Sequence, residues 1–173
     1  MIFDNKSDIK YLKKSYRTTI EIMNEANKIL NNVQNELKIK LAEPVARHGE
    51  DVKYEKFSSF EGKIDKIIDF VQRMKNNNYK NIAIICKTNE ECQKVYDKLK
   101  PRIEDINLII ENINKYDGGV TVVSSYFSKG LEFDSVIITD LENYDESLLD
   151  KKLLYISYTR AMHVLEVLKN EIG

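Results

Sequence analysis

Two arginines stand out because a guanidinium stays charged at neutral pH and its planar fork can hold two phosphate oxygens at once. Arg17 directly precedes a segment with helical spacing, and Arg160 follows a Leu-Leu-Tyr-Ile run in another such segment. A guanidinium placed beside a phosphoryl group in transfer can raise the rate by about 10³ or more. Each arginine, taken singly, also has an explanation without chemistry. Arg17 would lie on the solvated basic face of a helix, and Arg160 would form a surface ion pair.

A second group of polar residues lies between two apolar runs. Glu132 could accept hydrogen bonds from a sugar hydroxyl, and Gly130 could permit a turn or a close approach of the backbone. The hydroxyls of Ser124 and Ser125 could bind phosphates, and the ring of Tyr126 could stack on a base. The competing interpretations are a solvated carboxylate and a tyrosine that faces the core.

Other chemistries lack the residues that they need. Lys129 is not part of a phosphate-binding loop, because the chain contains no G-x-x-x-x-G-K-[ST] string. Cys86 and Cys92 form no CxxC pair and have no nearby base, so we expect buried, reduced thiols. His48 and His163 lack the spacing of metal ligands, and we expect no metal site.

The elements that must position these residues alternate along the chain. Thr18 with Glu21 predicts a capping box that starts a helix over 19–31, after a strand and turn over 9–17. The same apolar spacing is compatible with one long helix over 7–30. A polar connector follows over 31–40.

Apolar, β-branched runs and helical spacings continue to the C-terminal end. The predicted strands are two short ones within 44–57, then 82–86, 106–110, 120–125, 136–139 and 163–168. The predicted helices cover 64–74, the segment from a Thr88–Glu91 capping box to Pro101, and 147–161. This alternation indicates an α/β sandwich with a mainly parallel sheet and helices on both faces. Functional residues should lie at the carboxyl ends of its strands.

Composition limits the size and the partners of the protein. The chain has 173 residues, of which 42% are hydrophobic and 32% charged, which predicts one compact domain over 1–173. The 27 Lys and Arg residues balance 28 Asp and Glu residues, so any anionic partner must be bound locally. No stretch approaches the roughly 18 apolar residues of a membrane span, and the start is too polar for a secretory signal, so we expect a cytoplasmic protein without a membrane partner.

Three clusters together resemble motifs IV, V and VI of superfamily 1 helicases of the UvrD/Rep type. They are Ser15-Tyr16-Arg17-Thr18-Thr19, Ser128-Lys129-Gly130-Leu131-Glu132-Phe133 and Leu154-Tyr155-Ile156-Ser157-Tyr158-Thr159-Arg160-Ala161. The resemblance covers about 8–168 and implies a RecA-like three-layer sandwich, the second motor domain of such proteins. The segment 125–134, with Arg47-His48-Gly49 upstream, is most similar to the HelD-like branch, although a His commonly stands where Tyr126 is.

The resemblance implies a role for each candidate residue. Arg17 and Arg160 would reach the γ-phosphate of ATP, Glu132 would contact the ribose, and the 124–126 segment would touch single-stranded DNA or RNA. ATP with Mg²⁺ would be held mainly by the first RecA-like domain, since this chain has no Walker A lysine and no acidic metal-binding pair after a strand. We therefore expect an ATP-dependent DNA helicase or translocase, with 3′ to 5′ polarity implied by the family, whose second domain alone is inactive.

An alternative from another class stays open at the level of the sequence. A RecA-like domain of this kind could act as a non-catalytic interaction module that docks on RNA polymerase or a repair factor, which the HelD-like resemblance favours. A flavodoxin-like or nucleotide-binding Rossmann domain is disfavoured because no G-x-G-x-x-G follows the first predicted strand.

Overall fold

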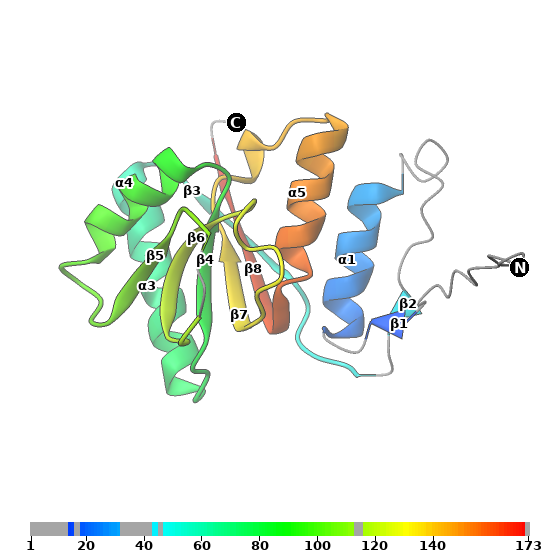
Figure 1. Ribbon diagram of the computed structural model, residues 1–173, viewed down its shortest axis with the longest axis horizontal. Coiled ribbons are helices and arrows are strands. Elements are labelled where there is room, and N and C mark those ends of the chain that lie inside the picture. The colour runs from blue at the N-terminus through cyan, green and yellow to red at the C-terminus, as the bar shows by residue number, and fades with distance from the viewer. Residues whose placement is uncertain (1–13, 16–17, 32–42, 45–46, 113–115, 172–173) are drawn as a thin grey trace, which may run out of the picture.

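The chain folds around a six-stranded sheet whose strands all run parallel (Figure 1). The computed structural model describes residues 14–15, 18–31, 43–44, 47–112 and 116–171. The strand order is β3-β8-β7-β4-β6-β5, with bounds Lys53–Phe57 (β3), Ile82–Cys86 (β4), Ile106–Ile109 (β5), Val120–Ser124 (β6), Phe133–Ile138 (β7) and Ala161–Asn170 (β8). A separate two-residue parallel pair joins β1 (Lys14–Ser15) to β2 (Glu43–Pro44).

Continuous apolar runs form the centre of the sheet, as the sequence predicts. β4 and β6 are buried along their whole length and pair residue for residue, from Ile82 opposite Val120 to Cys86 opposite Ser124. Strands covered on both faces are typically near-continuous apolar runs rather than alternating ones. Cys86 and Cys92 are both buried free thiols, as expected.

Among the described residues, α-helices cover both faces of this sheet (Figure 1). α3 (Phe60–Asn76) and α4 (Asn89–Leu99) pack on one face, and α1 (Ile20–Leu30) and α5 (Leu148–Tyr158) pack on the other. A short 3-10 helix, η1 (Leu141–Asn143), follows β7. The predicted three-layer α/β sandwich is confirmed.

The start of α1 differs from the sequence prediction by one residue and by its cap. Thr19 has an extended backbone and its hydroxyl accepts from Ile22 N at 3.4 Å, so the N-cap is Thr19 and a continuous helix over 7–30 is wrong. The predicted Thr18–Glu21 capping box is also wrong. The Glu21 carboxylate instead accepts from Gly49 N at 2.8 Å and lies 2.8 Å from His48 Nδ1, because a distant segment competes for it.

The end of α5 also differs from the prediction. The helix ends at Tyr158 rather than near 161, with Thr159 as its C-cap. The change is enforced by the sheet, since Phe133 N donates to Arg160 O at 3.0 Å and Ala161 pairs with Phe133. Of the predicted strand and turn over 9–17, only Lys14–Ser15 is described and it is a strand, while the predicted connector lies almost wholly outside the described residues.

The described helices are all too short or too polar to traverse a lipid bilayer.

Candidate functional site

The segment between β6 and β7 crosses the sheet from one edge to the other. Parallel strands all begin at one edge, called here the amino edge, and all end at the carboxyl edge. β6 ends at Ser124 on the carboxyl edge and β7 begins at Phe133 on the amino edge, so residues 125–132 must run between them. Phe127 and Leu131 pack this segment against the core beneath α1 and α5. The crossing separates the candidate residues into two groups.

Arg160 and Glu132 lie together at the amino edge, directly before β8 and β7. The Phe133 N to Arg160 O hydrogen bond joins the two strand starts at 3.0 Å. Each precedes a strand, so neither lies at a carboxyl end, where the general rule for parallel sheets predicts functional residues. Both side chains are half-buried.

The Arg160 guanidinium is held by its own domain through three hydrogen bonds. Nε donates to Ile156 O at 3.1 Å, Nη1 to Leu131 O at 3.0 Å and Nη2 to Thr159 Oγ1 at 3.3 Å. The sequence placed Arg160 inside the predicted helix over 147–161. The structure places it one residue beyond the C-cap, where carbonyl groups of α5 and of the 125–132 segment fix it.

Arg47 links the start of α1 to the start of β8 at the amino edge. The carbonyl of Arg47 accepts from Ile20 N at 3.0 Å, and its guanidinium donates from Nη2 to Met162 O in β8. Gly49 packs so closely that a Cβ there would lie 2.4 Å from Thr19 Cγ2.

Arg17 lies outside the described residues, so its predicted role stays a prediction. Thr18, the next residue, is buried near this edge.

The Glu21 carboxylate at the start of α1 is strongly stabilised in its ionised form. The hydrogen bond with His48 and those from backbone N–H groups lower its pKa to about 2, against an ordinary value of 4.5. Sequence reasoning placed Glu21 in a capping box and excluded His48 as a metal ligand, and it missed their pairing across 27 residues.

Gly130 owes its identity to backbone conformation. Its φ is +85°, in the left-handed region that favours glycine, and a Cβ there would meet no atom within 4 Å. The positive φ agrees with the predicted turn, and the predicted close approach of the backbone to a bound group stays a prediction.

The other group of candidates follows β6 at the carboxyl edge. Ser124 and Ser125 are 1% and 0% exposed, whereas Tyr126 is 69% exposed and meets Phe127 edge to face at 5.1 Å. Tyr126 is therefore a surface tyrosine, not a core-facing one. The two serine hydroxyls do not reach the surface, so a strand bound here would meet the backbone or the Tyr126 ring.

A buried hydroxyl network, which the sequence analysis missed, holds Ser125 in place. Ser125 Oγ lies 3.3 Å from Cys86 O, contacts Tyr144 Oη, and is 3.1 Å from Ser157 Oγ on α5. Desolvation in this network raises the pKa of Tyr144. No local pattern marks it, because its members come from three separate segments.

Two ion pairs stabilise the carboxyl edge, and no sequence pattern predicted either of them. Lys63 Nζ in α3 lies 2.8 and 2.7 Å from the two carboxylate oxygens of Asp140, which follows β7. Lys87, directly after β4, pairs with Asp150 in the first turn of α5 and donates to Asn143 O at 2.7 Å. These contacts fix the ends of β4 and β7 relative to the helices.

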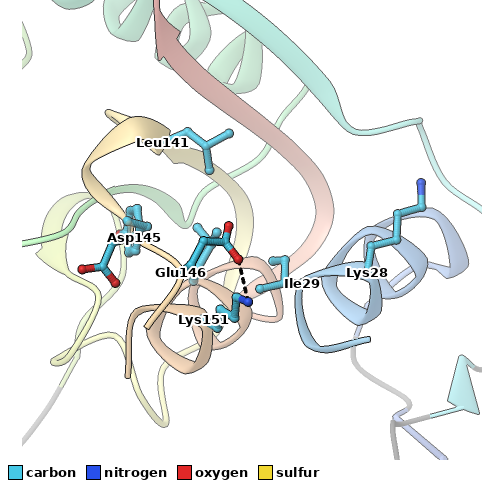
Figure 2. Close-up of a pocket in the computed structure, with 8 residues that line it drawn as sticks. Lys28, Ile29, Leu141, Asp145, Glu146 and Lys151 are labelled. Atoms are coloured by element: carbon cyan, nitrogen blue, oxygen red, sulfur yellow. Dashed lines mark ion pairs between the residues drawn. The ribbon is translucent and has the colours of Figure 1, made fainter. Parts of the chain in front are cut away.

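A pocket of about 300 Å³ lies between the end of α1 and the start of α5 (Figure 2). Lys28 and Lys151 line it, but Lys28 pairs with Glu25, and Lys151 Nζ lies 2.6 Å from Glu146. Its cations are engaged by carboxylates, which makes it a poor phosphate site. It is also at the opposite end of α1 and α5 from Arg160.

Within the described part of the chain, no group of three or more His, Cys, Asp or Glu side chains could hold a metal ion. His163, one of the two histidines, stacks on Tyr79 with ring centroids 5.4 Å apart.

Fold and site together define an α/β domain with a basic group and a carboxylate at one sheet edge and an exposed tyrosine at the other. A family model described as the UvrD-like helicase C-terminal domain matches residues 10–112, and a second model with that description matches residues 119–168. The chain therefore belongs to the UvrD-like helicase C-terminal domain family, as its three motifs predicted. The HelD-like branch stays a prediction.

Solved structures agree with this assignment. The chain is 33% identical to the C-terminal domain of a possible DNA helicase from Lactobacillus plantarum WCFS1, with a TM-score of 0.72 over 90% of this chain and 87% of that one. The arterivirus nonstructural protein 10 helicase, in complex with DNA, is 12% identical with a TM-score of 0.50 over 68% of this chain and 28% of the viral one, which shows a shared fold. No curated protein matches the chain.

Proposed function

We propose that the chain is the second motor domain of an ATP-dependent DNA helicase or translocase. In this proposal it completes a nucleotide site whose main part belongs to a first RecA-like domain. The observation that carries the proposal is the Arg160 guanidinium at the amino edge, which donates to Ile156 O and to the carbonyl of Leu131, the residue before Glu132, in a chain of the UvrD-like family. ATP with Mg²⁺ is the substrate, and the metal is assigned to the first domain.

Arg160 suits the stabilisation of charge on a transferred phosphoryl group. Its three hydrogen bonds fix the guanidinium before any ligand arrives, and a preorganised charge costs little reorganisation during reaction. Its charge does not depend on pH near neutrality. Glu132, on the neighbouring strand start, takes the ribose hydroxyls, and Arg17 supplies a second guanidinium from the segment before α1.

Tyr126 supplies the nucleic-acid contact in this proposal. Its exposed ring at the carboxyl edge can stack on a base, and stacking tolerates any sequence. The DNA complex of the arterivirus helicase supports DNA as the strand. Ser124 and Ser125 contribute their backbone and the position of Tyr126, since their hydroxyls are buried.

The nucleotide part is tested on the full-length protein with Arg160→Ala and Arg17→Ala. We expect each to lower ATP turnover stimulated by single-stranded DNA about 10³-fold. Arg102→Ala is the matched control, because Arg102 lies on the surface and its Nη2 pairs with Asp65 at 2.9 Å. Turnover close to wild type in both test variants would overturn the assignment.

The isolated chain gives a second test. We expect residues 1–173 alone to have negligible ATPase activity, with or without single-stranded DNA, because the main nucleotide site is on another domain. Robust turnover by this chain would contradict the proposal.

The nucleic-acid part is tested by Tyr126→Ala and Tyr126→Phe in the full-length protein. Loss of stacking should weaken single-stranded DNA binding roughly 5- to 150-fold, whereas the phenylalanine ring should retain the affinity. Phe60→Ala removes another exposed aromatic ring, on α3, as a control. Equal affinities of the alanine variant and wild type would exclude Tyr126 from the interface.

A further inference from the structure

A ring of hydrogen bonds joins the neighbour of Tyr126 to Arg160. Along the 125–132 segment, Ser128 Oγ donates to Ser125 O at 2.8 Å, and Leu131 N donates to Ser128 O at 3.1 Å. Arg160 Nη1 then donates to Leu131 O at 3.0 Å. This route leads from the carboxyl edge to the amino edge of the sheet.

Ser157 closes the ring through α5. Its backbone carbonyl accepts from Arg160 N at 3.3 Å, and its Oγ lies 3.1 Å from Ser125 Oγ. Both serines are 0% exposed, so water does not compete for these hydroxyls. Ser125 and Arg160 are thus connected by two independent routes, of which the Ser157 route is the shorter.

The Ser157 hydroxyl has two acceptors within reach and one proton to give. Leu153 O, one turn earlier in α5, lies at 2.9 Å, and Ser125 Oγ lies at 3.1 Å. A hydroxyl donates one hydrogen bond at a time. The Ser157 hydroxyl can therefore donate either to Leu153 O in its own helix or to Ser125 Oγ in the 125–132 segment. The two arrangements differ in the position of the proton and need little movement of the heavy atoms.

We propose that Ser157 is a positioning residue that links the occupancy of Tyr126 to the placement of Arg160. A base stacked on Tyr126 acts on Ser125, the adjacent residue, and Ser125 acts through Ser157 on the last turn of α5. The inference rests on the proposed function, since it assumes a strand at Tyr126 and a nucleotide at Arg160.

The test measures ATP turnover of the full-length protein with and without single-stranded DNA. Ser157→Ala should lower the ratio of stimulated to basal turnover about 5-fold, the equivalent of one hydrogen bond worth about 1 kcal/mol. Ser135→Ala is the matched control: Ser135 is fully buried in β7, and its Oγ has no hydrogen-bond partner among the described residues. This control should keep the wild-type ratio.

Ser125→Ala provides a second variant should Ser157→Ala fold poorly, and it should lower the same ratio. The double variant should lower the ratio no more than the single variants do, because both substitutions break the same Ser125–Ser157 contact. Additive losses, an unchanged ratio, or equal falls in basal and stimulated turnover would overturn the positioning role. Absence of DNA-stimulated turnover in the wild type would instead contradict the proposed function.

Discussion

Arg160 Nη1 lies 3.0 Å from the carbonyl oxygen of Leu131, so the residue after the C-cap of α5 also secures the end of the 125–132 segment. The guanidinium meets the backbone of both α5 and this segment. Such a contact needs a planar fork with several donors, which distinguishes arginine from lysine at this position.

Arg160→Lys should therefore fail to restore function in the full-length protein. An ammonium cannot reproduce three diverging hydrogen bonds and a phosphate contact, and we expect DNA-stimulated turnover to fall about 10³-fold, as in Arg160→Ala. Steady-state ATPase measurements check this, with Arg102→Lys as the surface control. A lysine variant with nearly wild-type turnover would show that charge alone suffices.

Gly130→Ala should destabilise the domain by about 1–2 kcal/mol. The space around Gly130 is open, so the cost comes from placing an L-residue at a φ of +85°. Gly130→Asn should cost less, because asparagine tolerates this region better than alanine. Urea unfolding of the isolated chain measures both. Equal stability of the alanine variant and wild type would mean that the turn relaxes.

Local patterns predicted most of the fold. The apolar run of β4 was predicted to the residue, and the Thr88–Glu91 capping box of α4 is present with both of its hydrogen bonds. These features depend on neighbours in the sequence. The start of α1 was predicted one residue early, because Glu21 bonds to a segment that lies 27 residues away.

The site was harder to predict because its geometry depends on pairing between distant segments. The sequence singled out Arg160 and Glu132 as candidates, but neither lies at a carboxyl end, where the general rule for parallel sheets predicts functional residues. It offered the Ser125 hydroxyl as a phosphate ligand, whereas this hydroxyl is buried and contacts Tyr144 and Ser157. Only the three-dimensional arrangement brings these hydroxyls together.

The Glu21 carboxylate should make stability depend on acidic pH. Its pKa is lowered to about 2 in the folded chain, chiefly by the hydrogen bond with His48 and also by the Gly49 N–H. A carboxyl with a depressed folded pKa stabilises the fold above its ordinary value of 4.5, and this stabilisation is lost as the pH falls toward 2. Glu21→Gln should therefore make Tm fall less than in the wild type between pH 4.5 and about pH 2.

Thermal unfolding from pH 2 to pH 7 measures the Glu21 effect. Glu104→Gln, at an exposed position, serves as the control for removal of one carboxylate. An identical pH profile in Glu21→Gln and wild type would contradict the assignment.

Lys63→Ala should be among the most damaging single changes in the chain. Lys63 and Asp140 have side chains only 9% and 10% exposed, and the Lys63 ammonium also lies 4.9 Å from the centre of the Phe60 ring. Removing the lysine leaves a buried carboxylate without its cation, which costs about 3–5 kcal/mol. By contrast, Lys98→Ala breaks a surface pair with Glu61 and should cost less than about 1 kcal/mol.

The double variant Lys63→Met/Asp140→Asn separates the value of the pair from the cost of breaking it. Replacing both charged residues removes the free-energy cost of burying two charges away from water. The double variant should therefore be more stable than Lys63→Ala. Asparagine at 140 keeps a residue that tolerates the φ of +52° found there. Urea unfolding gives the free energies. A loss below 1 kcal/mol in Lys63→Ala would mean that Asp140 finds water or another partner, and that the end of β7 does not depend on this pair.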